Sequence, residues 1–343
     1  MNNGCPERQA LVFDLGGTYL RCGIWDPCAG VSSLRRSRID NFLNSGCLNT
    51  VWDNLLRHIE DYTLSVSQSV PLEAPIVISF PGPIDKQHKI LGAPTFLGQA
   101  DTVPDLADSL QQRTGRKTYV LNDISAAAWH LSLTAGTSRF LVVTVSSGIG
   151  SKIFDASHPL GVMDAPAWAG EIGHLVVDES PEAPWCDCGE RGHLGALSSG
   201  RGIERAARLY ARENPGEFSR SSCATRFGAT ASTVDNEAHL VPAARLGDEW
   251  SLNVIRHATR PLARVILAIV VAAGIERVIV IGGFALSLGP VYLRILREEV
   301  AANCRYGILR HKVDSLLELG SGCEDACLLG AGAYAQRMME GCL

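Results

Sequence analysis

The sequence predicts an α/β protein of two related lobes, each of which opens with a β-hairpin. The chain has 343 residues, which is long enough for two domains with separate cores. Apolar runs with strand period alternate with helical patterns, as in α/β proteins. The layout of residues 10–26, ALVFDLGGTYLRCGIWD, returns at low identity in residues 141–155, LVVTVSSGIGSKIFD. Each segment reads as a strand, a turn of small residues and a second strand, so we interpret the pair as a weak internal repeat.

Six further segments follow the same alternating plan. We expect a helix over 49–64, then a strand over 75–85 that ends in a Pro-Gly turn. A strand running into an Ala-rich helix follows over 118–131, and an apolar-faced helix over 251–273. The last two are a strand over 276–286 that ends in Gly-Gly and a closing helix over 323–338. No low-complexity linker separates the lobes. We place the boundary near residue 121, with a smaller lobe of 1–121 plus 323–343 and a larger lobe of 122–322.

The composition excludes several classes of protein. Apolar content of 46% and charged content of 20% are typical of globular chains, and a net charge of −5 argues against a dedicated nucleic-acid binder. The N-terminus, MNNGCPERQA, lacks the apolar core of a signal peptide, and the longest apolar run, 265–275, is too short for a membrane span. The eleven scattered cysteines fit reduced thiols. We therefore expect a cytoplasmic protein with no membrane and no nucleic-acid partner.

Three glycine-containing turns are candidate nucleotide sites, because glycine lets the backbone approach a ligand and N–H groups cradle phosphate oxygens. The candidates are Asp14, Gly16, Gly17 and Thr18 in the first hairpin, Ser147 and Gly148 in the second, and Gly282 and Gly283 after a later strand. Asp14 could face a metal ion or its bound water. Each turn alone also fits an ordinary connection, whereas two related hairpins favour a phosphate clamp.

Asn122 and Asp123 stand where a predicted strand ends and a helix begins. Side chains at the carboxyl ends of strands in α/β sheets point toward the ligand, and a carboxylate there can take a proton from a hydroxyl nucleophile. The alternative is structural, since Asp is also a favoured helix N-cap. Judged alone, Asp123 fits the cap better.

Two cysteines and two histidines gather in the segment 170–197, GEIGHLVVDESPEAPWCDCGERGHLGAL. His174, Cys186, Cys188 and His193 supply four nitrogen and sulfur ligands, the set that structural Zn2+ prefers in a closed tetrahedral site. Gly189 and Gly192 would let the chain fold tightly around the ion. Buried thiols and surface histidines are the alternative, and the four ligand types together favour zinc.

These motifs, in this order, resemble those of the ROK family, a group of repressors, open reading frames and sugar kinases. The resemblance covers most of the chain, from DLGGT through FPGPID, LND, SSGIG, GEIGH, CDCGERGH and VIGG to LGAGAYA. The combination of GEIGH with CxCGxxG is its specific part. The resemblance implies two α/β lobes of the actin-like ATPase (ribonuclease H-like) type, with the sugar in a cleft between the lobes and a zinc loop over 170–200.

The resemblance also implies an activity and roles for the matching residues. The activity is transfer of the γ-phosphate of ATP to a hydroxyl, by family expectation a primary one, of a sugar or cyclitol. Asp123 would be the general base, and the contacts to the acceptor would come from Gly82, Asn122, Asp123, Glu171 and His174. The hairpins would hold ATP phosphates and Mg2+, and Gly282 and Gly283 would lie near the adenosine. Zinc would pin the loop that carries Glu171 and His174, and a homodimer is the expected assembly.

The sequence departs from the family at two positions. His193 stands where the family usually has Cys, and zinc accepts either ligand. At Gly195 the sugar kinases usually carry a Glu that holds hydroxyls near the anomeric end of a hexose. A charged hydrogen bond contributes roughly 1.5–3 kcal/mol, so its loss would weaken glucose recognition by about one to two powers of ten. We therefore favour a pseudo-sugar such as a C7-cyclitol of the valiolone type. The alternative is a glucokinase in which Glu190, Glu179 or water fills the gap.

Other classes of protein fit the sequence less well. A ROK repressor would carry a helix-turn-helix ahead of the DLGGT turn, and thirteen residues precede Asp14. A sugar sensor without catalytic activity would have no use for the base, yet Asp123 is present. A zinc-binding structural protein would leave the paired hairpins unexplained. We therefore expect an enzyme.

Overall fold

The computed structural model describes residues 8–16, 18–98, 103–320 and 325–341. The chain divides into two compact units. Unit 1 comprises Met1–Ser138, Lys152–Ala169 and Cys323–Leu343, and unit 2 comprises Arg139–Ser151 and Gly170–Gly322. Within the described ranges, no helix has both the length and the apolar content that a bilayer span requires.

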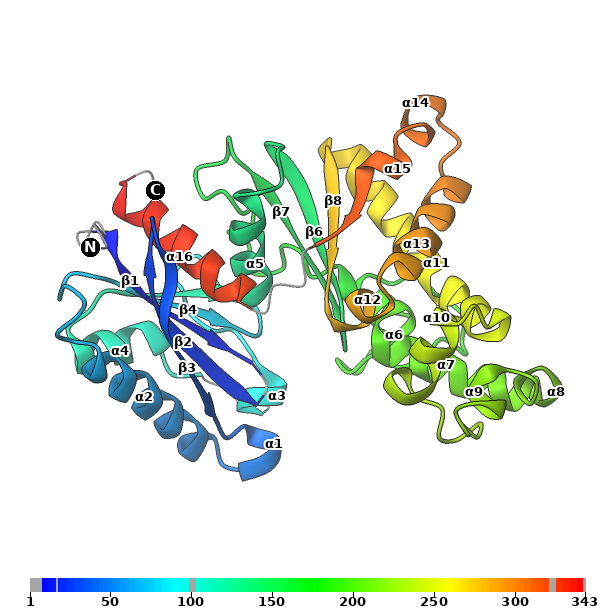
Figure 1. The fold of residues 1–343 in the computed structure, drawn as a ribbon, viewed down its shortest axis with the longest axis horizontal. Helices are drawn as coiled ribbons and strands as arrows, with labels where there is room; N and C mark the ends of the chain where they lie inside the picture. The colour runs from blue at the N-terminus through cyan, green and yellow to red at the C-terminus, as the bar shows by residue number, and fades with distance from the viewer. Residues whose placement is uncertain (1–7, 17, 99–102, 321–324, 342–343) are drawn as a thin grey trace. The chain divides into compact units, whose positions relative to one another are not determined.

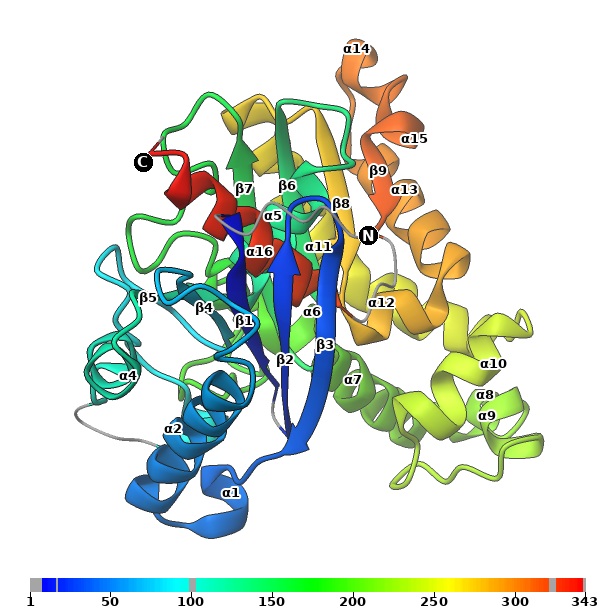
Figure 2. The same ribbon diagram turned by 60° about the vertical axis from the view of Figure 1, so that its left-hand side comes forward.

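Unit 1 is built on a five-stranded sheet with the strand order β3-β2-β1-β4-β5. The strands are β1 (Ala10–Leu15), β2 (Tyr19–Asp26), β3 (Gly30–Arg38), β4 (Ile76–Phe80) and β5 (Thr118–Asn122). The first three strands pair antiparallel, and β4 and β5 continue the sheet in parallel. Figure 2 shows β1, β2 and β3 side by side. The predicted first hairpin is confirmed, while the strand expected over 75–85 ends earlier, at Phe80.

The two faces of this sheet differ in character because side chains alternate along each strand. On one face Leu11, Phe13 and Ile78 join an apolar core with residues of α2 (Leu48–Ser65) and α4 (Leu106–Thr114). The other face packs on α16 (Ala326–Met339), which lies beside α5 (Asp123–Ser132) in Figure 1. Two short helices, α1 (Phe42–Ser45) and α3 (Pro94–Leu97), complete the unit. The polar residues of the candidate site lie on the α16 side.

The boundary between the units differs from the prediction. The first unit extends to Ser138 instead of ending near 121, and residues 152–169 return to it. The reason is packing: β5 pairs in parallel with β4, and α5 packs along α16, so the strand and the helix over 118–132 belong to the first unit. The C-terminal segment Cys323–Leu343 lies in unit 1, as expected.

Unit 2 repeats the sheet order of unit 1. Its strands follow one another as β7-β6-β8-β9, with β6 (Arg139–Val145), β7 (Ile149–Asp155), β8 (Arg277–Ile281) and β9 (Leu317–Leu319). A hairpin, β6 and β7, stands at one edge and two parallel strands follow, just as β2, β1, β4 and β5 do in unit 1. The internal repeat expected from the sequence is therefore present as a repeated topology.

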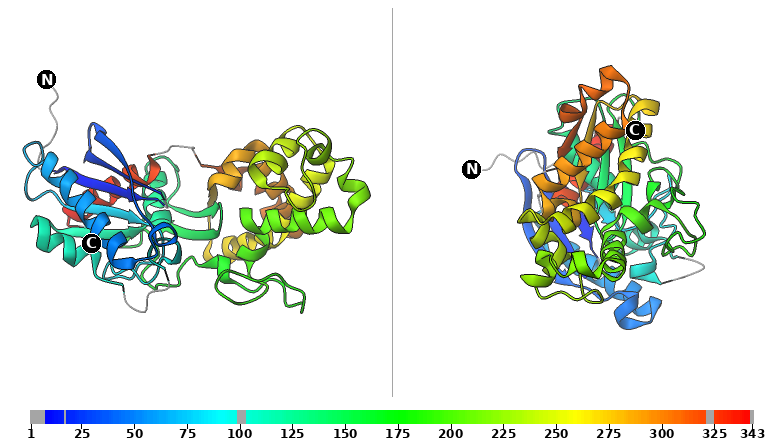
Figure 3. Two further views of the ribbon diagram at one scale, coloured as in Figure 1. Left: turned by 90° about the horizontal axis from the view of Figure 1, so that it is seen from below. Right: turned by 90° about the vertical axis from the view of Figure 1, so that its right-hand side faces the viewer.

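The helices of unit 2 gather into one bundle, coloured green to orange in Figure 3. The longest is α11 (Glu249–Ala273), which packs against α7 (Gly200–Glu213) and α13 (Pro290–Asn303). The shorter elements are η2 (Ile172–His174), α6 (Leu194–Ser198), α8 (Pro215–Phe218), α9 (Ser222–Thr225), η3 (Asn236–Leu240), α10 (Val241–Arg245), α12 (Gly283–Leu288), α14 (Gly307–Arg310) and α15 (Val313–Leu316). The candidate metal centre lies in the segment from η2 to the start of α6.

We predict that Gly330→Ala destabilises unit 1, because a Cβ at Gly330 would overlap the carbonyl oxygen of Ala126 where α16 meets α5. Overpacking of this kind costs about 1–3 kcal/mol or more. Urea unfolding monitored by circular dichroism measures the loss. Gly216→Ala is the matched control, since a Cβ there meets no atom within 4 Å. An equal effect of both substitutions would contradict the close approach of the two helices.

Candidate active site and metal centre

Asp14 is the centre of a polar cluster on the α16 side of the unit 1 sheet. The strand register aligns Asp14 with Arg21 on β2 and with Ser79 on β4. The Ser79 hydroxyl donates to Asp14 Oδ1 at 2.8 Å, and Arg21 Nε donates to Oδ2 at 3.1 Å. Asp14 is buried. Oδ2 accepts two N–H groups of Arg21, whereas Oδ1 accepts the Ser79 hydroxyl and keeps a lone pair that a metal-bound water could use.

The turn beside Asp14 opens on a hollow of about 620 Å³ in unit 1. Gly16 begins the turn, and its N–H donates to the carbonyl of Tyr19 at 2.9 Å. Gly16 and Thr18 line the hollow together with Arg21 and Arg36. The predicted phosphate-binding residue Gly17 lies outside the described residues. The geometry leaves room for a charged ligand next to Asp14.

The residue that caps α5 is Asn122 and not Asp123. Asn122 Oδ1 accepts from the N–H groups of Ile124 at 3.0 Å and Ser125 at 3.3 Å, which makes it the N-cap. Its Nδ2 donates to the carbonyl of Gly82 at 2.9 Å. The prediction that Asp123 is the N-cap of the helix is therefore wrong, because the side-chain amide of Asn122 is the N-cap. Asp123 is the first residue of α5, and its Oδ1 accepts from the Ile124 N–H at 2.8 Å.

The surroundings of Asp123 raise its pKa from 3.8 to about 6. Burial is the main cause, because neighbouring protein atoms desolvate the carboxylate although part of its surface stays accessible. The Ile124 N–H lowers the pKa, the negative charge of Asp14 raises it, and the Lys152 ammonium lowers it. A carboxylate with a pKa near 6 is ionised at pH 7 and basic enough to accept a proton from a polarised hydroxyl.

Gly82 lies between Asn122 and the chain at Gly92. Its φ of +132° lies in a region that side chains disfavour, and a Cβ there would overlap the carbonyl oxygen of Gly92. Its own carbonyl accepts from Asn122 Nδ2. Asn122 Oδ1 is already occupied by two N–H groups, so Asn122 retains one Nδ2 hydrogen for an acceptor. Asn122 thus supports the backbone at Gly82 and at the start of α5, and this one hydrogen is what its side chain could offer to a substrate.

The second and third glycine turns meet in unit 2. The N–H of Ser146 donates to the carbonyl of Gly148 at 3.0 Å, which closes the turn between β6 and β7. Gly282 follows β8 with φ of +100°, and a Cβ there would lie 2.6 Å from the carbonyl oxygen of Val145. A Cβ at Gly283 would lie 3.6 Å from Ser146 Oγ. The structure therefore brings Ser147, Gly148, Gly282 and Gly283 to one region of unit 2.

The predicted zinc ligands form one cluster. One ligand atom from each of His174, Cys186, Cys188 and His193 lies within 4.8 Å of the others. Cys188 Sγ lies 3.2 Å from His193 Nδ1, and Cys186 Sγ lies 3.9 Å from His174 Nδ1. Bond lengths to tetrahedral zinc put ligand atoms roughly 3.3–3.8 Å apart. The donor set and the spacing fit Zn2+, which these four residues could hold.

The backbone around the cluster is closely folded. The Cys186 N–H donates to the carbonyl of Glu190 at 2.7 Å, and the Gly189 N–H donates to that of Cys186 at 3.0 Å. Gly192 has φ of +72°, and a Cβ there would overlap the carbonyl oxygen of Asp178. The two glycines that the sequence singled out thus permit the turn that places both cysteines.

The GEIGH segment connects this centre to β7. Its first residue, Gly170, accepts from the Ser151 N–H at 2.9 Å. A Cβ at Gly173 would overlap the carbonyl oxygen of Ile149. His174 directs Nδ1 toward Cys186 and is otherwise exposed, so the rest of its ring is open to a ligand. The Glu171 side chain is half-buried at the start of the η2 turn.

Gly195 packs against the same segment. It lies in α6, and a Cβ there would lie 3.2 Å from the carbonyl oxygen of Gly173. The corner that the sequence suggested to be enlarged is therefore partly filled by the backbone of the GEIGH turn. A glutamate at this position requires that turn to shift by a few tenths of an ångström.

Four residues near the two carboxylates were missed by sequence reasoning. Arg21 and Ser79 contact Asp14, Lys152 lowers the pKa of Asp123, and Cys327 Sγ lies 3.7 Å from the Asp123 carbonyl oxygen. Strand alternation carried a signal for Arg21, which pairs directly with Asp14 in the hairpin register. The sequence carries no comparable signal for Cys327, because α16 reaches this place only through tertiary packing.

The repeated sheet, with a glycine turn in each hairpin and a carboxylate after β5, is the arrangement expected of a phosphotransferase of the actin-like class. The ROK family model matches residues 11–338. The chain is 36% identical over 332 residues to the C(7)-cyclitol 7-kinase of Streptomyces hygroscopicus subsp. jinggangensis, covering 95% of this chain and 93% of that protein. It is 28% identical to the glucokinase of Thermotoga maritima over 342 residues, with coverages of 98% and 100%. The chain belongs to the ROK family.

A solved structure supports the same fold. The ROK family glucokinase from Streptomyces griseus, in complex with glucose and AMPPNP, superimposes with a TM-score of 0.71 at 22% identity. The match covers 94% of this chain and 98% of that chain. At this identity the likeness concerns the fold. The expected α/β class is thus confirmed.

We predict that the purified protein contains one zinc ion per chain and that Cys186→Ser loses most of it, because a hydroxyl replaces a thiolate ligand. Elemental analysis after exhaustive dialysis measures the metal. Cys28→Ser is the matched control, since Cys28 is an exposed thiol outside the cluster. Equal zinc in the two variants would remove Cys186 from the ligand set.

Proposed function

We propose that this ROK protein is an ATP-dependent kinase that phosphorylates a hydroxyl of a C7-cyclitol. The observation that carries the proposal is Asp123, a carboxylate at the end of β5 whose pKa is raised to about 6. It occurs in a chain 36% identical to a C(7)-cyclitol 7-kinase over nearly its full length. A glucokinase is the second candidate, favoured by the full-length similarity to the Thermotoga maritima enzyme.

Asp123 acts as the general base in this proposal. It takes the proton of the acceptor hydroxyl as the oxygen forms its bond to the γ-phosphorus of ATP. The bond from that phosphorus to the β,γ-bridging oxygen breaks, and ADP leaves with the electron pair. Because the transition state is loose, most of the rate enhancement comes from positioning and from neutralising charge. The raised pKa places Asp123 near the optimum for a base at neutral pH.

The donor is held by the glycine turns. Within unit 1, Gly16 and Thr18 beside Asp14 would offer donors to phosphate oxygens. Within unit 2, Ser147 and Gly148 would do the same, and Gly282 and Gly283 would lie against the adenosine. Mg2+, when bound, neutralises charge on the phosphate oxygens. Asp14 would hold the water shell of that ion through the lone pair on Oδ1 that Ser79 leaves open.

The acceptor is held by Gly82, Asn122, Glu171 and His174, besides Asp123. A Zn2+ ion held by His174 Nδ1 would leave the other ring nitrogen for a substrate hydroxyl and would fix the tautomer. The metal would thus orient the GEIGH turn and take no part in the chemistry. The favoured acceptor is a carbocycle with a primary hydroxyl, since Gly195 offers no carboxylate for the anomeric hydroxyl of a hexose.

We predict that Asp123→Asn lowers turnover by about a hundredfold or more, because an amide accepts no proton under these conditions. In the wild type, kcat/KM falls as the pH drops below about 6, when Asp123 becomes protonated. Coupled ADP-release assays between pH 5 and 8.5 measure both effects. Wild-type turnover in the variant would show that Asp123 is not the base.

The stability of Asp123→Asn separates catalysis from folding. A carboxyl whose folded pKa is raised from 3.8 to about 6 favours the folded state when protonated, and this contribution is lost as the pH rises through 6. The uncharged Asn side chain avoids this loss of stability at high pH, and it keeps an oxygen that accepts from the Ile124 N–H. At pH 8 the variant should unfold at the same temperature as the wild type or higher. A lower unfolding temperature would assign the lost turnover to misfolding.

We predict that a C7-cyclitol is turned over at least tenfold better, in kcat/KM, than glucose, and that Gly195→Glu narrows this ratio. The introduced carboxylate supplies the hydrogen bond that a hexose needs, with the magnitude of a charged pair. A panel of hexoses, amino sugars and cyclitols with Mg-ATP measures the ratio. Gly195→Ala is the control for crowding against Gly173. Strong wild-type turnover of glucose would favour the glucokinase.

A further inference from the structure

Arg201, near the start of α7, contacts two loops of unit 2 at once. Its Nε donates to the carbonyl of Ser147 at 2.9 Å, in the turn between β6 and β7. Its Nη1 lies 2.7 Å from Oδ2 of Asp187, which stands between the predicted zinc ligands Cys186 and Cys188. The guanidinium of Arg201 thus connects the turn between β6 and β7, which we propose to bind phosphate, to the loop that carries Cys186 and Cys188.

The backbone under Arg201 is fixed. The Gly200 N–H donates to the carbonyl of Ser146 at 2.7 Å, and a Cβ at Gly200 would lie 2.8 Å from that oxygen. Ser199 caps the helix by accepting from the Gly202 N–H at 3.2 Å. The start of α7 is therefore tied directly to the phosphate turn, and only the side chain of Arg201 is able to change partners.

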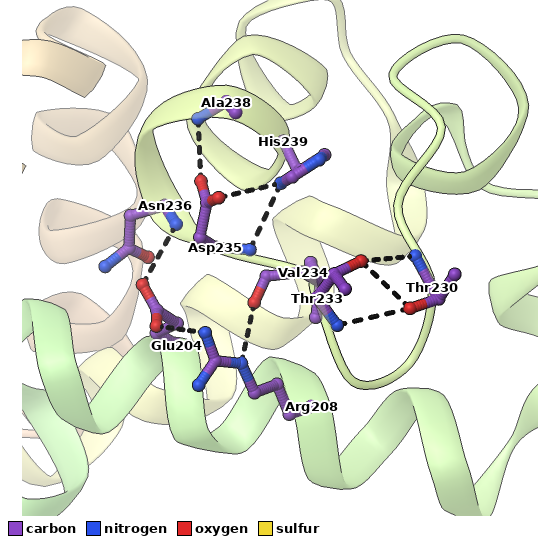
Figure 4. A network of polar contacts seen from close by, with 9 residues as sticks. All are labelled: Glu204, Arg208, Thr230, Thr233, Val234, Asp235, Asn236, Ala238 and His239. Atoms are coloured by element: carbon purple, nitrogen blue, oxygen red, sulfur yellow. Dashed lines mark hydrogen bonds and ion pairs between the residues drawn. The ribbon is translucent and has the colours of Figure 1, made fainter.

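A polar network holds the next turns of α7 (Figure 4). Glu204 accepts from the N–H of Asn236 at 3.2 Å, and Arg208 Nε donates to the carbonyl of Val234 at 2.9 Å. Asp235 caps η3 by accepting from the Ala238 N–H at 2.7 Å. Through these contacts the loop before η3 braces the helix. The position of the Arg201 Cα is thus independent of the pair with Asp187.

The ion pair between Arg201 and Asp187 is readily exchanged. Both side chains are well exposed, at 60% and 64% of their surfaces. Pairs this exposed contribute little to stability and weaken as salt rises. The guanidinium carries five N–H donors, and its contacts with described residues leave some of them available. A phosphate group, with more charge and a matching fork geometry, binds such an arginine more strongly than one exposed carboxylate does.

We infer that Arg201 binds a phosphate of the nucleotide donor and exchanges Asp187 for it. The inference rests on the proposed kinase function, because it requires the nucleotide to lie at Ser147 and Gly148. In the free protein Arg201 holds Asp187, and donor binding releases the loop segment between Cys186 and Cys188. Donor and acceptor sites are thereby coupled through one side chain, and the coupling acts equally in both directions.

Calorimetric titration with Mg-AMP-PNP, without acceptor, tests the exchange. Arg201→Gln should weaken binding by about tenfold or more, the effect of one charge-assisted hydrogen bond. Arg201→Lys should restore part of it. Asp187→Asn should tighten binding by up to about fivefold, because it removes the competing partner of Arg201. The opposite signs of the two substitutions are the signature of exchange.

Two matched variants control for charge and for loop damage. Arg205→Gln removes an arginine one turn further along α7, whose Nη1 donates to the carbonyl of Trp185 at 2.8 Å, and should leave nucleotide affinity unchanged. Glu190→Gln removes one negative charge from the same loop without touching Arg201, and should tighten binding less than Asp187→Asn does. All variants should retain the zinc content of the wild type.

Three results would overturn the inference. Unchanged affinity in Arg201→Gln would exclude a phosphate contact. Weaker binding in Asp187→Asn would show that the pair is a fixed support and that no exchange occurs. Equal tightening by Glu190→Gln and Asp187→Asn would assign the effect to net charge alone. Failure of the wild type to bind Mg-AMP-PNP would instead refute the proposed kinase function itself.

Discussion

The arrangement of the region around Asp123 in unit 1 depends on the amide of Asn122. Its oxygen accepts two N–H groups at the start of α5, and its nitrogen binds the carbonyl of Gly82. One side chain thus caps a helix and fastens the loop after β4 to the end of β5. Because the cap is filled by Asn122, Asp123 keeps a carboxylate that is desolvated and not committed to closing the helix. The raised pKa follows from that burial and from the charge of Asp14.

The repeated topology explains why both units carry a glycine turn in the same structural place. In each sheet an antiparallel hairpin precedes parallel strands, so the hairpin turn projects at the same end as the carboxyl ends of those strands. In unit 1 that end presents Asp14 and Asp123. In unit 2 it presents the turn at Ser147 and the glycines after β8, which approach one another closely enough to exclude a side chain at Gly282. Duplication of one fold thus yields two different surfaces for a ligand.

The sequence predicted most of the elements and the grouping of the four candidate metal ligands, because both depend on local pattern. Strand alternation fixed the hairpins, and four ligand residues in one segment indicated the cluster that the structure forms. Properties that depend on tertiary packing were not predicted. The unit boundary moved to Ser138 because α5 packs on α16, a helix about two hundred residues away along the chain. The contact between Gly195 and the backbone of Gly173 was not predicted for the same reason, since that backbone belongs to a separate turn.

The loop that carries the four candidate metal ligands is held by its contacts with neighbouring elements of unit 2. Gly173 lies against Ile149 at the start of β7 and against Gly195 of α6, so the GEIGH turn is held by backbone contacts on two sides. A zinc ion on His174 would add a third constraint, at the one residue of the turn that also faces solvent. Arg201 then connects the opposite end of this loop to the β6–β7 turn through an ion pair that is weak enough to break. The proposed acceptor turn and the proposed donor contact can therefore coexist in one loop, because backbone packing at Gly173 holds the first and an exposed ion pair at Asp187 carries the second.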